Sequence, residues 1–184
     1  MLLLVVEKSK IIITTGDEME AKIVIDEMVA KDWGQVRDIY IEGINTGNAT
    51  FDTEAPSWEK WNNVHRETCR LVARDGENVI GWAALSSVSS KKAYDGVAEV
   101  SIYLSGDSTG RGIGSKLLKA LIETSEANGF WTLQSGIFPE NKSSITLHKN
   151  FDFTEVGVRK RVGQLHGVWR DVVMLERRSS IVGV

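Results

Sequence analysis

A glycine-rich segment near the middle of the chain has the composition of an anion-binding turn. It separates an apolar stretch from a segment with helical periodicity and reads Gly110-Arg111-Gly112-Ile113-Gly114-Ser115. Glycines let backbone N–H groups come close to an anion, and a helix N-terminus adds partial positive charge. Arg111 could add a charge-assisted contact to a phosphate. A plain glycine-rich turn that only starts a helix fits the local pattern equally well, because short glycine motifs are common.

Two common phosphate-binding motifs do not fit this spacing. A Walker A loop requires Gly-Lys followed by Ser or Thr, whereas Lys116 follows Ser115 and precedes Leu117. A dinucleotide fingerprint requires Gly-x-Gly-x-x-Gly, whereas Leu117 stands at the position of the third glycine. Both motifs are therefore excluded.

Glu99 is the candidate for acid–base chemistry. It lies inside the apolar stretch 97–104, although Glu is disfavoured in strands. Strand alternation would place Glu99, Ser101 and Tyr103 on one face, beside the glycine-rich turn. An amine must lose a proton before its nitrogen can attack, so a carboxylate here would suit a general base. A solvated Glu on an edge strand fits the periodicity as well.

The histidines and the cysteine offer little chemistry by spacing alone. His65, His148 and His166 show no paired spacing of the kind that binds metals, so no metal is expected. The lone Cys69 excludes an internal disulfide and a cysteine cluster. Asn141 follows Pro139 and Glu140 and is a good helix N-cap, a role that leaves a ligand contact open.

The elements that must position these residues alternate between strand-like and helix-like segments. Periodicity, capping residues and the Asp-Gly turn at 75–78 are the signals. Helices are predicted at 31–45, 57–64, 113–127 and 141–150, and strands at 21–28, 70–74, 79–87, 97–104, 130–138, 151–161 and 168–177. A loop spans 46–56. The order, with no repeat or linker, predicts one mixed α/β domain.

Composition excludes several classes of protein. The 184 residues are 42% hydrophobic and 26% charged, as in an ordinary globular domain. A net charge of −3 argues against nucleic-acid binding. No apolar run reaches the roughly 20 residues of a membrane span, and the start lacks the features of a signal peptide, so we expect a cytoplasmic protein. Residues 1–18 are predicted to be an extension, 19–178 the domain and 179–184 a tail.

These segments together resemble the GCN5-related N-acetyltransferase (GNAT) superfamily, whose acetyl-CoA loop usually reads Gln/Arg-x-x-Gly-x-Gly/Ala. Gly112 and Gly114 match its small positions, whereas Thr109 stands where Gln or Arg is usual. The resemblance covers roughly residues 23–178. Three segments resemble the phosphinothricin acetyltransferase group in particular: residues 49–54, Tyr94 followed by residues 98–103, and residues 167–172.

The resemblance implies a fold and a co-substrate. The fold would be α/β (α+β), with a central mixed, mostly antiparallel seven-stranded sheet flanked by helices and splayed between residues 97–104 and 130–138. Acetyl-CoA would enter this gap with its pyrophosphate on residues 111–115, and backbone amides of 102–104 would hold its pantetheine arm and polarise the thioester carbonyl. The implied contacts are Ser101, Ile102, Tyr103, Leu104, Gly110, Arg111, Gly112, Ile113, Gly114, Ser115 and Asn141.

The resemblance also implies roles at the acceptor side. Glu99 would be the general base, and His148 would protonate the departing thiolate, although a lone helical histidine is more often structural. Phe51, Lys92 and Tyr94 would contact a small-molecule amine, such as phosphinothricin or methionine sulfoximine or sulfone, that attacks directly in a ternary complex. Phe51 could equally anchor its loop. A homodimer is expected from the resemblance.

Two other functions remain open at this point. A protein N-terminal or lysine acetyltransferase of the same fold would need an open groove for a peptide, whereas the loop 46–56 is long enough to cover the acceptor site. A non-catalytic acetyl-CoA-binding module is the other alternative. Glu99 discriminates against it, because a pure binder does not need a base on that strand.

Overall fold

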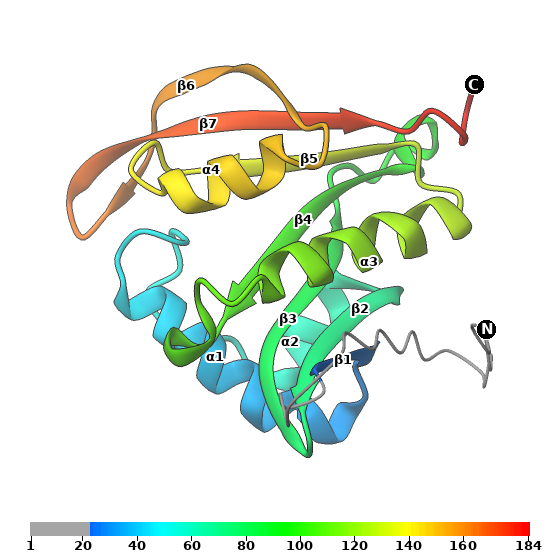
Figure 1. Cartoon of the computed structure of the whole chain (residues 1–184). Helices are drawn as coiled ribbons and strands as arrows, with labels where there is room; N and C mark the ends of the chain where they lie inside the picture. Colours follow the sequence, from blue (N-terminus) through cyan, green and yellow to red (C-terminus); the bar gives the residue numbers. More distant parts are fainter. Residues whose placement is uncertain (1–22) are drawn as a thin grey trace.

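The structure, a computed structural model, describes residues 23–184 as a single layer of sheet with helices on both faces (Figure 1). The predicted extension 1–18 lies outside the described residues. Seven strands form one sheet in the order β1-β2-β3-β4-β5-β7-β6. They are β1 (Ile23–Glu27), β2 (His65–Asp75), β3 (Asn78–Ser87), β4 (Val97–Leu104), β5 (Thr132–Ile137), β6 (Thr154–Leu165) and β7 (Val168–Arg178). All neighbours are antiparallel except β4 and β5. The expected mixed, mostly antiparallel sheet is confirmed.

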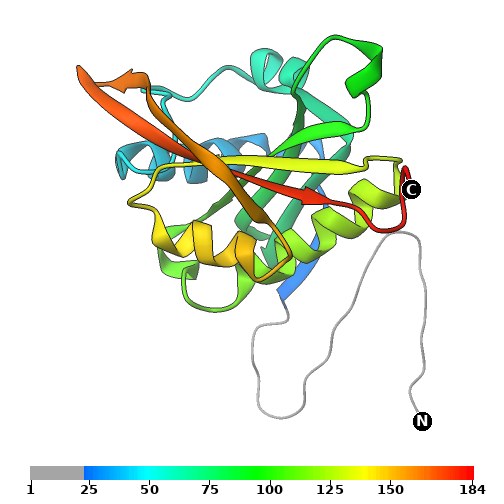
Figure 2. The ribbon, with the colours of Figure 1, turned by 90° about the horizontal axis from the view of Figure 1, so that it is seen from above.

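Four α-helices cover the two faces of the sheet (Figure 2). The helices α1 (Trp33–Asn45) and α2 (Trp58–Val64) lie on one face, and α3 (Ile113–Ala127) and α4 (Lys142–Lys149) on the other. Short 3-10 turns, η1 (Ala30–Asp32), η2 (Lys92–Tyr94) and η3 (Gly106–Ser108), join other elements. The capping residues act as the sequence predicts: the Ser57 hydroxyl accepts a hydrogen bond from the Lys60 N–H (3.4 Å), and the Asn141 side chain accepts one from the Ser144 N–H (3.1 Å).

The two faces bury different kinds of side chain. On the α3 face, Leu117, Leu118 and Leu121 are fully buried against the aliphatic side of the central strands. On the α1 face the core is aromatic: Trp82 stacks on Tyr103 with ring centroids 4.8 Å apart and meets Trp61 edge-on at 5.7 Å. The aliphatic stripe of α3 and the aromatic face together fix the orientation of β4 between them.

The pairing of β4 with β5 stops early. Only Val97, Ala98 and Glu99 have partners on β5, whereas β4 pairs with β3 from Ala98 to Leu104. Beyond Glu99 the two strands diverge, as Figure 1 shows. One edge of β4 from Val100 onward therefore carries backbone groups with no strand partner, which is where a ligand can add hydrogen bonds.

The boundaries predicted for two strands are wrong, for different reasons. The strand β2 begins at His65 rather than at residue 70, because a register shift between His65 and Arg70 interrupts the alternation. The strand β6 covers Thr154–Leu165 rather than 151–161. Its start is delayed because the Phe151 and Phe153 N–H groups still donate to the His148 carbonyl, and its second register shift lies between Arg159 and Gly163.

Residues 179–184 follow β7 without further helix or strand. The Arg178 guanidinium holds this tail by donating to the Val182 carbonyl (2.8 Å) and the Trp131 carbonyl (2.8 Å). Among the residues that the structure describes, no helix has the length and apolar character needed to span a membrane.

Candidate active site

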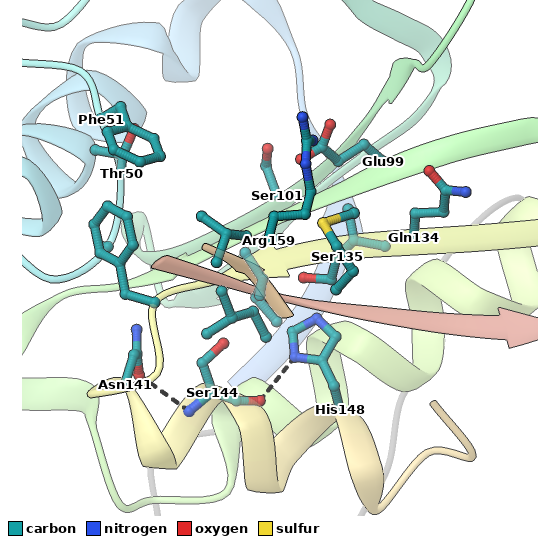
Figure 3. A pocket seen from close by; sticks show the side chains of 18 of the residues that line it. Thr50, Phe51, Glu99, Ser101, Gln134, Ser135, Asn141, Ser144, His148 and Arg159 are labelled. Carbon is teal, nitrogen blue, oxygen red and sulfur yellow. Dashed lines mark hydrogen bonds between the residues drawn. The ribbon is translucent and has the colours of Figure 1, made fainter. Parts of the chain in front are cut away.

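A cavity of about 680 Å³ opens where β4 and β5 separate (Figure 3). Its wall is formed by β4, β5, α4, β6, β7 and the loop 46–56. Several predicted site residues line it together: Phe51, Glu99, Ser101, Ile102, Tyr103, Asn141 and His148. The sequence-derived candidates from distant segments thus meet at one place.

Glu99 is the last residue of β4 that pairs with β5, and the gap between these two strands begins there. Ser101 lines the same cavity, while Leu104 and Ile102, which also reaches the cavity wall, pack against the aliphatic core, in agreement with the predicted alternation. Burial raises the pKa of Glu99 above its ordinary value, and the charge of Arg159 opposes that rise. The side chain is nonetheless exposed to the open cavity, so the raised pKa reflects the nearby cavity walls rather than enclosure, and the carboxylate accepts a proton more readily than a fully solvated one.

Gly136 on β5 leaves room in front of the Glu99 carboxylate. A Cβ atom at position 136 would lie 3.2 Å from Val172 Cγ1 and 3.7 Å from Glu99 Oε1. The glycine therefore keeps open the space between the carboxylate and the β7 side of the cavity.

His148 is buried, with 1% of its surface exposed, and its Nδ1 lies 2.8 Å from the Ser144 carbonyl oxygen. Because a carbonyl only accepts hydrogen bonds, Nδ1 carries the proton. Burial lowers the pKa of His148, which favours the neutral ring. The buried Nε2 has no partner among the described residues, so the ring presents an acceptor on the cavity wall.

The loop 46–56 is tied across one end of the cavity. The Phe51 ring meets Phe138 edge-on at 4.8 Å, and a Cβ atom on Gly163 would lie only 2.9 Å from the Phe51 ring. The Tyr40 hydroxyl donates to Asp52 (2.5 Å). Burial, and next to it the Asp52 carboxylate, raise the pKa of Tyr40 to about 12, so this donor stays protonated. Phe51 thus both lines the cavity and anchors its loop.

Asn141 also holds this loop. While its Oδ1 caps α4, its Nδ2 donates to the Asn48 carbonyl oxygen (3.2 Å). Arg170 adds a second tie, because its guanidinium donates to the Gly47 carbonyl (3.0 Å) and lies over the Phe138 ring at 4.2 Å. The capping role of Asn141 is confirmed, whereas its contact with coenzyme A stays a prediction.

The glycine-rich turn has the geometry of an anion site. Gly110 and Gly112 take positive φ angles of 75° and 74°, and Gly112 is the N-cap of α3. The first hydrogen bond of the helix runs from the Lys116 N–H to the Gly112 carbonyl, so the N–H groups of residues 113–115 have no helical partner. Together with the unpaired edge of β4, these N–H groups are donors of the kind that phosphates need, and their contact with coenzyme A stays a prediction.

Gly114 has a different use. A Cβ atom there would lie 3.2 Å from Leu147 Cδ2 and 3.5 Å from Leu104 Cδ1. This glycine therefore allows α3 to pack closely against α4 and β4, which is a structural need beyond phosphate binding.

Lys92 and Tyr94 are not brought to the cavity. They belong to the surface turn η2, where Tyr94 is 48% exposed, and neither lines the wall that Glu99 shares. Their contact with an acceptor stays a prediction.

Sequence reasoning missed Arg159, Gln134 and Ser135, which line the same cavity. Arg159 belongs to the run Arg159-Lys160-Arg161, which reads as an ordinary solvated strand face. Gln134 and Ser135 are small polar residues in a strand that gave no chemical signal. Only the three-dimensional arrangement identifies these three.

The chain belongs to the acetyltransferase (GNAT) family, whose model matches residues 33–153. It is an acetyl-CoA-dependent N-acetyltransferase of the phosphinothricin acetyltransferase type. It is 33% identical over 165 residues to the phosphinothricin N-acetyltransferase of Streptomyces coelicolor, which covers 85% of this chain and 96% of that protein. The predicted resemblance is thereby confirmed.

Two further relatives carry information on ligands. An L-methionine sulfoximine/L-methionine sulfone acetyltransferase of Pseudomonas aeruginosa is 35% identical over 107 residues, covering 58% of this chain and 62% of that protein. The crystal structure of a GNAT superfamily phosphinothricin acetyltransferase from Sinorhizobium meliloti in complex with acetyl-CoA superimposes with a TM-score of 0.79. It is 30% identical and covers 88% of this chain and 90% of that one.

Proposed function

We propose that this enzyme acetylates the amino group of a small amino acid analogue, such as phosphinothricin or methionine sulfoximine or sulfone, by direct attack within a ternary complex. The observation that carries the proposal is the position of Glu99, which lies in the cavity where β4 and β5 separate, beside the open edge of β4. The named substrates of the relatives support the acceptor class.

Glu99 would take a proton from the acceptor ammonium, directly or through a water molecule. The freed nitrogen lone pair forms the new C–N bond with the acetyl carbon, and the C–S bond to the coenzyme breaks. The nitrogen gives up a second proton as it becomes an amide, and the coenzyme gains one proton and leaves as the free thiol. Acetyl-CoA supplies the activated acyl group. The unpaired N–H groups along the edge of β4 can stabilise the negative charge that develops on the carbonyl oxygen.

The protonation state of His148 restricts the proton-donor role that the family resemblance implies. A ring that donates from Nδ1 to Ser144 holds a lone pair, not a proton, on Nε2. It can protonate a thiolate only after gaining a second proton, which burial opposes. We propose that His148 first accepts a hydrogen bond or a proton in the cavity and donates it only from that charged form.

The anchored loop beside the cavity supports a small acceptor over a polypeptide. Phe51, Asp52, Gly47 and Asn48 each contact another element, so the loop 46–56 is held at one end of the cavity, where it would limit the room for a peptide. A peptide acceptor would have to break several of these contacts before it reached Glu99.

The test is an acetyl-CoA assay over a panel of amines, with free thiol as readout. We expect turnover with methionine sulfone or phosphinothricin and little with a peptide that has a free N-terminus. Faster acetylation of the peptide would favour the protein acetyltransferase, and no thiol release with any acceptor would favour the non-catalytic module.

We also propose a homodimer formed through the β6–β7 hairpin. Large apolar side chains are exposed there, including Val156, Val168 (61% exposed) and Trp169 (55% exposed). Aromatic residues are enriched at the cores of interfaces. Light scattering at micromolar concentration should report about twice the 20.4 kDa of one chain, and a monomer mass would contradict the proposal.

A further inference from the structure

Glu99 and Arg159 are the only residues with a formal charge among the described residues that line the cavity. They come from opposite walls, β4 and β6, and Figure 3 shows the Arg159 side chain extending toward Glu99 and Ser101. Within residues 23–184 Arg159 forms no ion pair and donates no side-chain hydrogen bond. A planar guanidinium with free donors on the wall of a cavity is suited to bind a carboxylate with two hydrogen bonds.

The backbone holds Arg159 in this place through a bulge. Arg159 pairs with Val172 of β7, but Gly163 pairs with Arg170, so β6 has two more residues than β7 between these points. Arg161 takes a positive φ of 49° within the bulge, and its N–H donates to Asp171 Oδ1 (2.8 Å). Asp171 thereby holds the bulge of β6 that directly follows Arg159.

The carboxylate of Glu99 and the guanidinium of Arg159 are complementary to the two charges of a zwitterion. An α-amino acid carries an ammonium and a carboxylate on one carbon, so its ammonium can face Glu99 while its carboxylate faces Arg159. A plain amine would meet the guanidinium with a like charge and leave it without a partner. A peptide N-terminus has no free carboxylate on that carbon and would gain nothing from Arg159.

We propose that Arg159 is a substrate-binding residue that holds the carboxylate of an α-amino acid acceptor whose amino group lies at Glu99. This assignment rests on the acetyl transfer proposed above and narrows its acceptor to free α-amino acids and their analogues. It differs from a merely electrostatic role, in which Arg159 would act on Glu99 whatever the acceptor.

The test compares L-methionine sulfone with its decarboxylated analogue, in which hydrogen replaces the carboxylate. Arg159→Leu should lower kcat/KM for methionine sulfone by about 10- to 100-fold, the range that hydrogen bonds to a charged group support. For the decarboxylated amine the variant should stay within about threefold of the wild type. Arg159→Lys should recover part of the loss with methionine sulfone.

Lys160→Leu is the matched control, because Lys160 is the next residue of β6, carries the same charge and does not line the cavity. It should change neither acceptor's kcat/KM. The KM for acetyl-CoA should be unchanged in the Arg159 variants, and a raised value would show that Arg159 binds the coenzyme instead. An equal loss with both acceptors would show that Arg159 acts through Glu99, and either result overturns the proposal.

Calorimetric binding of methionine sulfone to the coenzyme A complex separates this proposal from acetyl transfer itself. If methionine sulfone binds to the wild type but not to Arg159→Leu, and the wild type releases no thiol, the carboxylate site is supported and acetyl transfer is refuted. If thiol is released equally well by the wild type and by Arg159→Leu, acetyl transfer is supported and the carboxylate site is refuted. If the wild type neither binds nor acetylates methionine sulfone or phosphinothricin, both proposals are wrong for α-amino acids.

Discussion

The two halves of the sheet, β1 to β4 and β5 to β6 in the strand order, differ in how completely their strands are paired. From β1 to β4 each strand pairs antiparallel with the next along most of its length, over an aromatic core in which Trp61 and Trp82 are buried. From β5 to β6 the sheet is joined to the first half by only three residues of parallel pairing. The cavity and nearly all of its polar residues lie at this junction. The paired half supplies rigidity, and the incomplete junction supplies open backbone and space for ligands.

Two histidines show the same difference at the scale of one side chain. His65 and His148 each place Nδ1 at 2.8 Å from the carbonyl oxygen four residues earlier. His65 stacks on Trp61 at 4.1 Å in the paired half, whereas His148 lines the cavity. The local contact is identical, so only the surroundings make one ring structural and the other available for chemistry.

The largest effect is expected at Glu99. Glu99→Gln removes the proton acceptor, so kcat should fall by about 10²- to 10⁴-fold while acetyl-CoA binding persists. The defect should shrink as pH rises, because more acceptor is then already deprotonated. A pH–rate profile on one amine measures both features.

The control for Glu99 is Glu67→Gln, an exposed strand glutamate of the paired half. It should leave kcat unchanged. Retention of more than about half of the wild-type kcat by Glu99→Gln at neutral pH would be far short of a general base. The base would then have to be sought elsewhere, beginning with His148.

The second effect concerns two glycines with the same backbone shape. Gly112 and Gly76 have φ angles of 74° and 60°, and no atom lies within 4 Å of a Cβ added at either. Alanine costs about 1–2 kcal/mol in this region. At Gly112 that strain falls on the anion turn, so Gly112→Ala should raise the KM for acetyl-CoA by about 5- to 30-fold.

Gly76→Ala, in the hairpin between β2 and β3, should lower stability by a similar amount without changing any KM. Urea unfolding and acetyl-CoA titration of both variants distinguish the two cases. Unchanged cofactor affinity in Gly112→Ala would mean that the turn does not hold the phosphates. Gly114 is unsuitable for this test, because a side chain there would contact Leu147 and disturb packing.

Much of the fold was predictable because single faces of helices and strands must be apolar. The stripe of α3, the Asp-Gly turn and the caps Ser57 and Asn141 depend on neighbouring residues alone, and they fold as predicted. The bulges in β2 and β6 were not predictable, because an inserted residue shifts the alternation that identifies a strand.

The candidate site was predictable where a residue type was unusual for its element. Glu99 in an apolar strand and the glycines before a helix gave such signals. Arg159 did not, because it belongs to a run of basic residues that is typical of a solvated strand face, and only the fold brings it to the cavity that Glu99 lines. Nor could the sequence show that the surface turn η2 keeps Lys92 and Tyr94 away from the cavity.

The third effect is a pH dependence of stability shared by both histidines. Burial lowers the pKa of His65 and of His148, so the unfolded chain binds protons that the folded chain does not. Stability should therefore be intact above the unfolded pKa of about 6.5 and fall as pH drops from there toward the folded values. Each unit of pKa lowering corresponds to about 1.4 kcal/mol.

His65→Gln and His148→Gln should each reduce the slope of unfolding free energy between about pH 6.5 and 5. Only His148→Gln should also change kcat, because only His148 reaches the cavity. Equal losses of activity in both variants would contradict the division between the paired half and the junction.

The smallest effect compares the caps of α2 and α4. Ser57→Ala and Asn141→Ala each remove one side-chain acceptor at a helix start, which costs about 1 kcal/mol of stability. Asn141 alone also holds the loop 46–56 through its Nδ2 hydrogen bond to Asn48. Asn141→Ala should therefore raise the acceptor KM by a few fold, about what one neutral hydrogen bond of 0.5–1.5 kcal/mol gives, whereas Ser57→Ala should not.

Asn141→Asp separates the two functions, because a carboxylate can still cap α4 but cannot donate to the Asn48 carbonyl. That variant should keep its unfolding midpoint near the wild type and still show the raised acceptor KM. A change in the KM for acetyl-CoA rather than for the acceptor would show instead that Asn141 contacts the coenzyme, as the family resemblance implies.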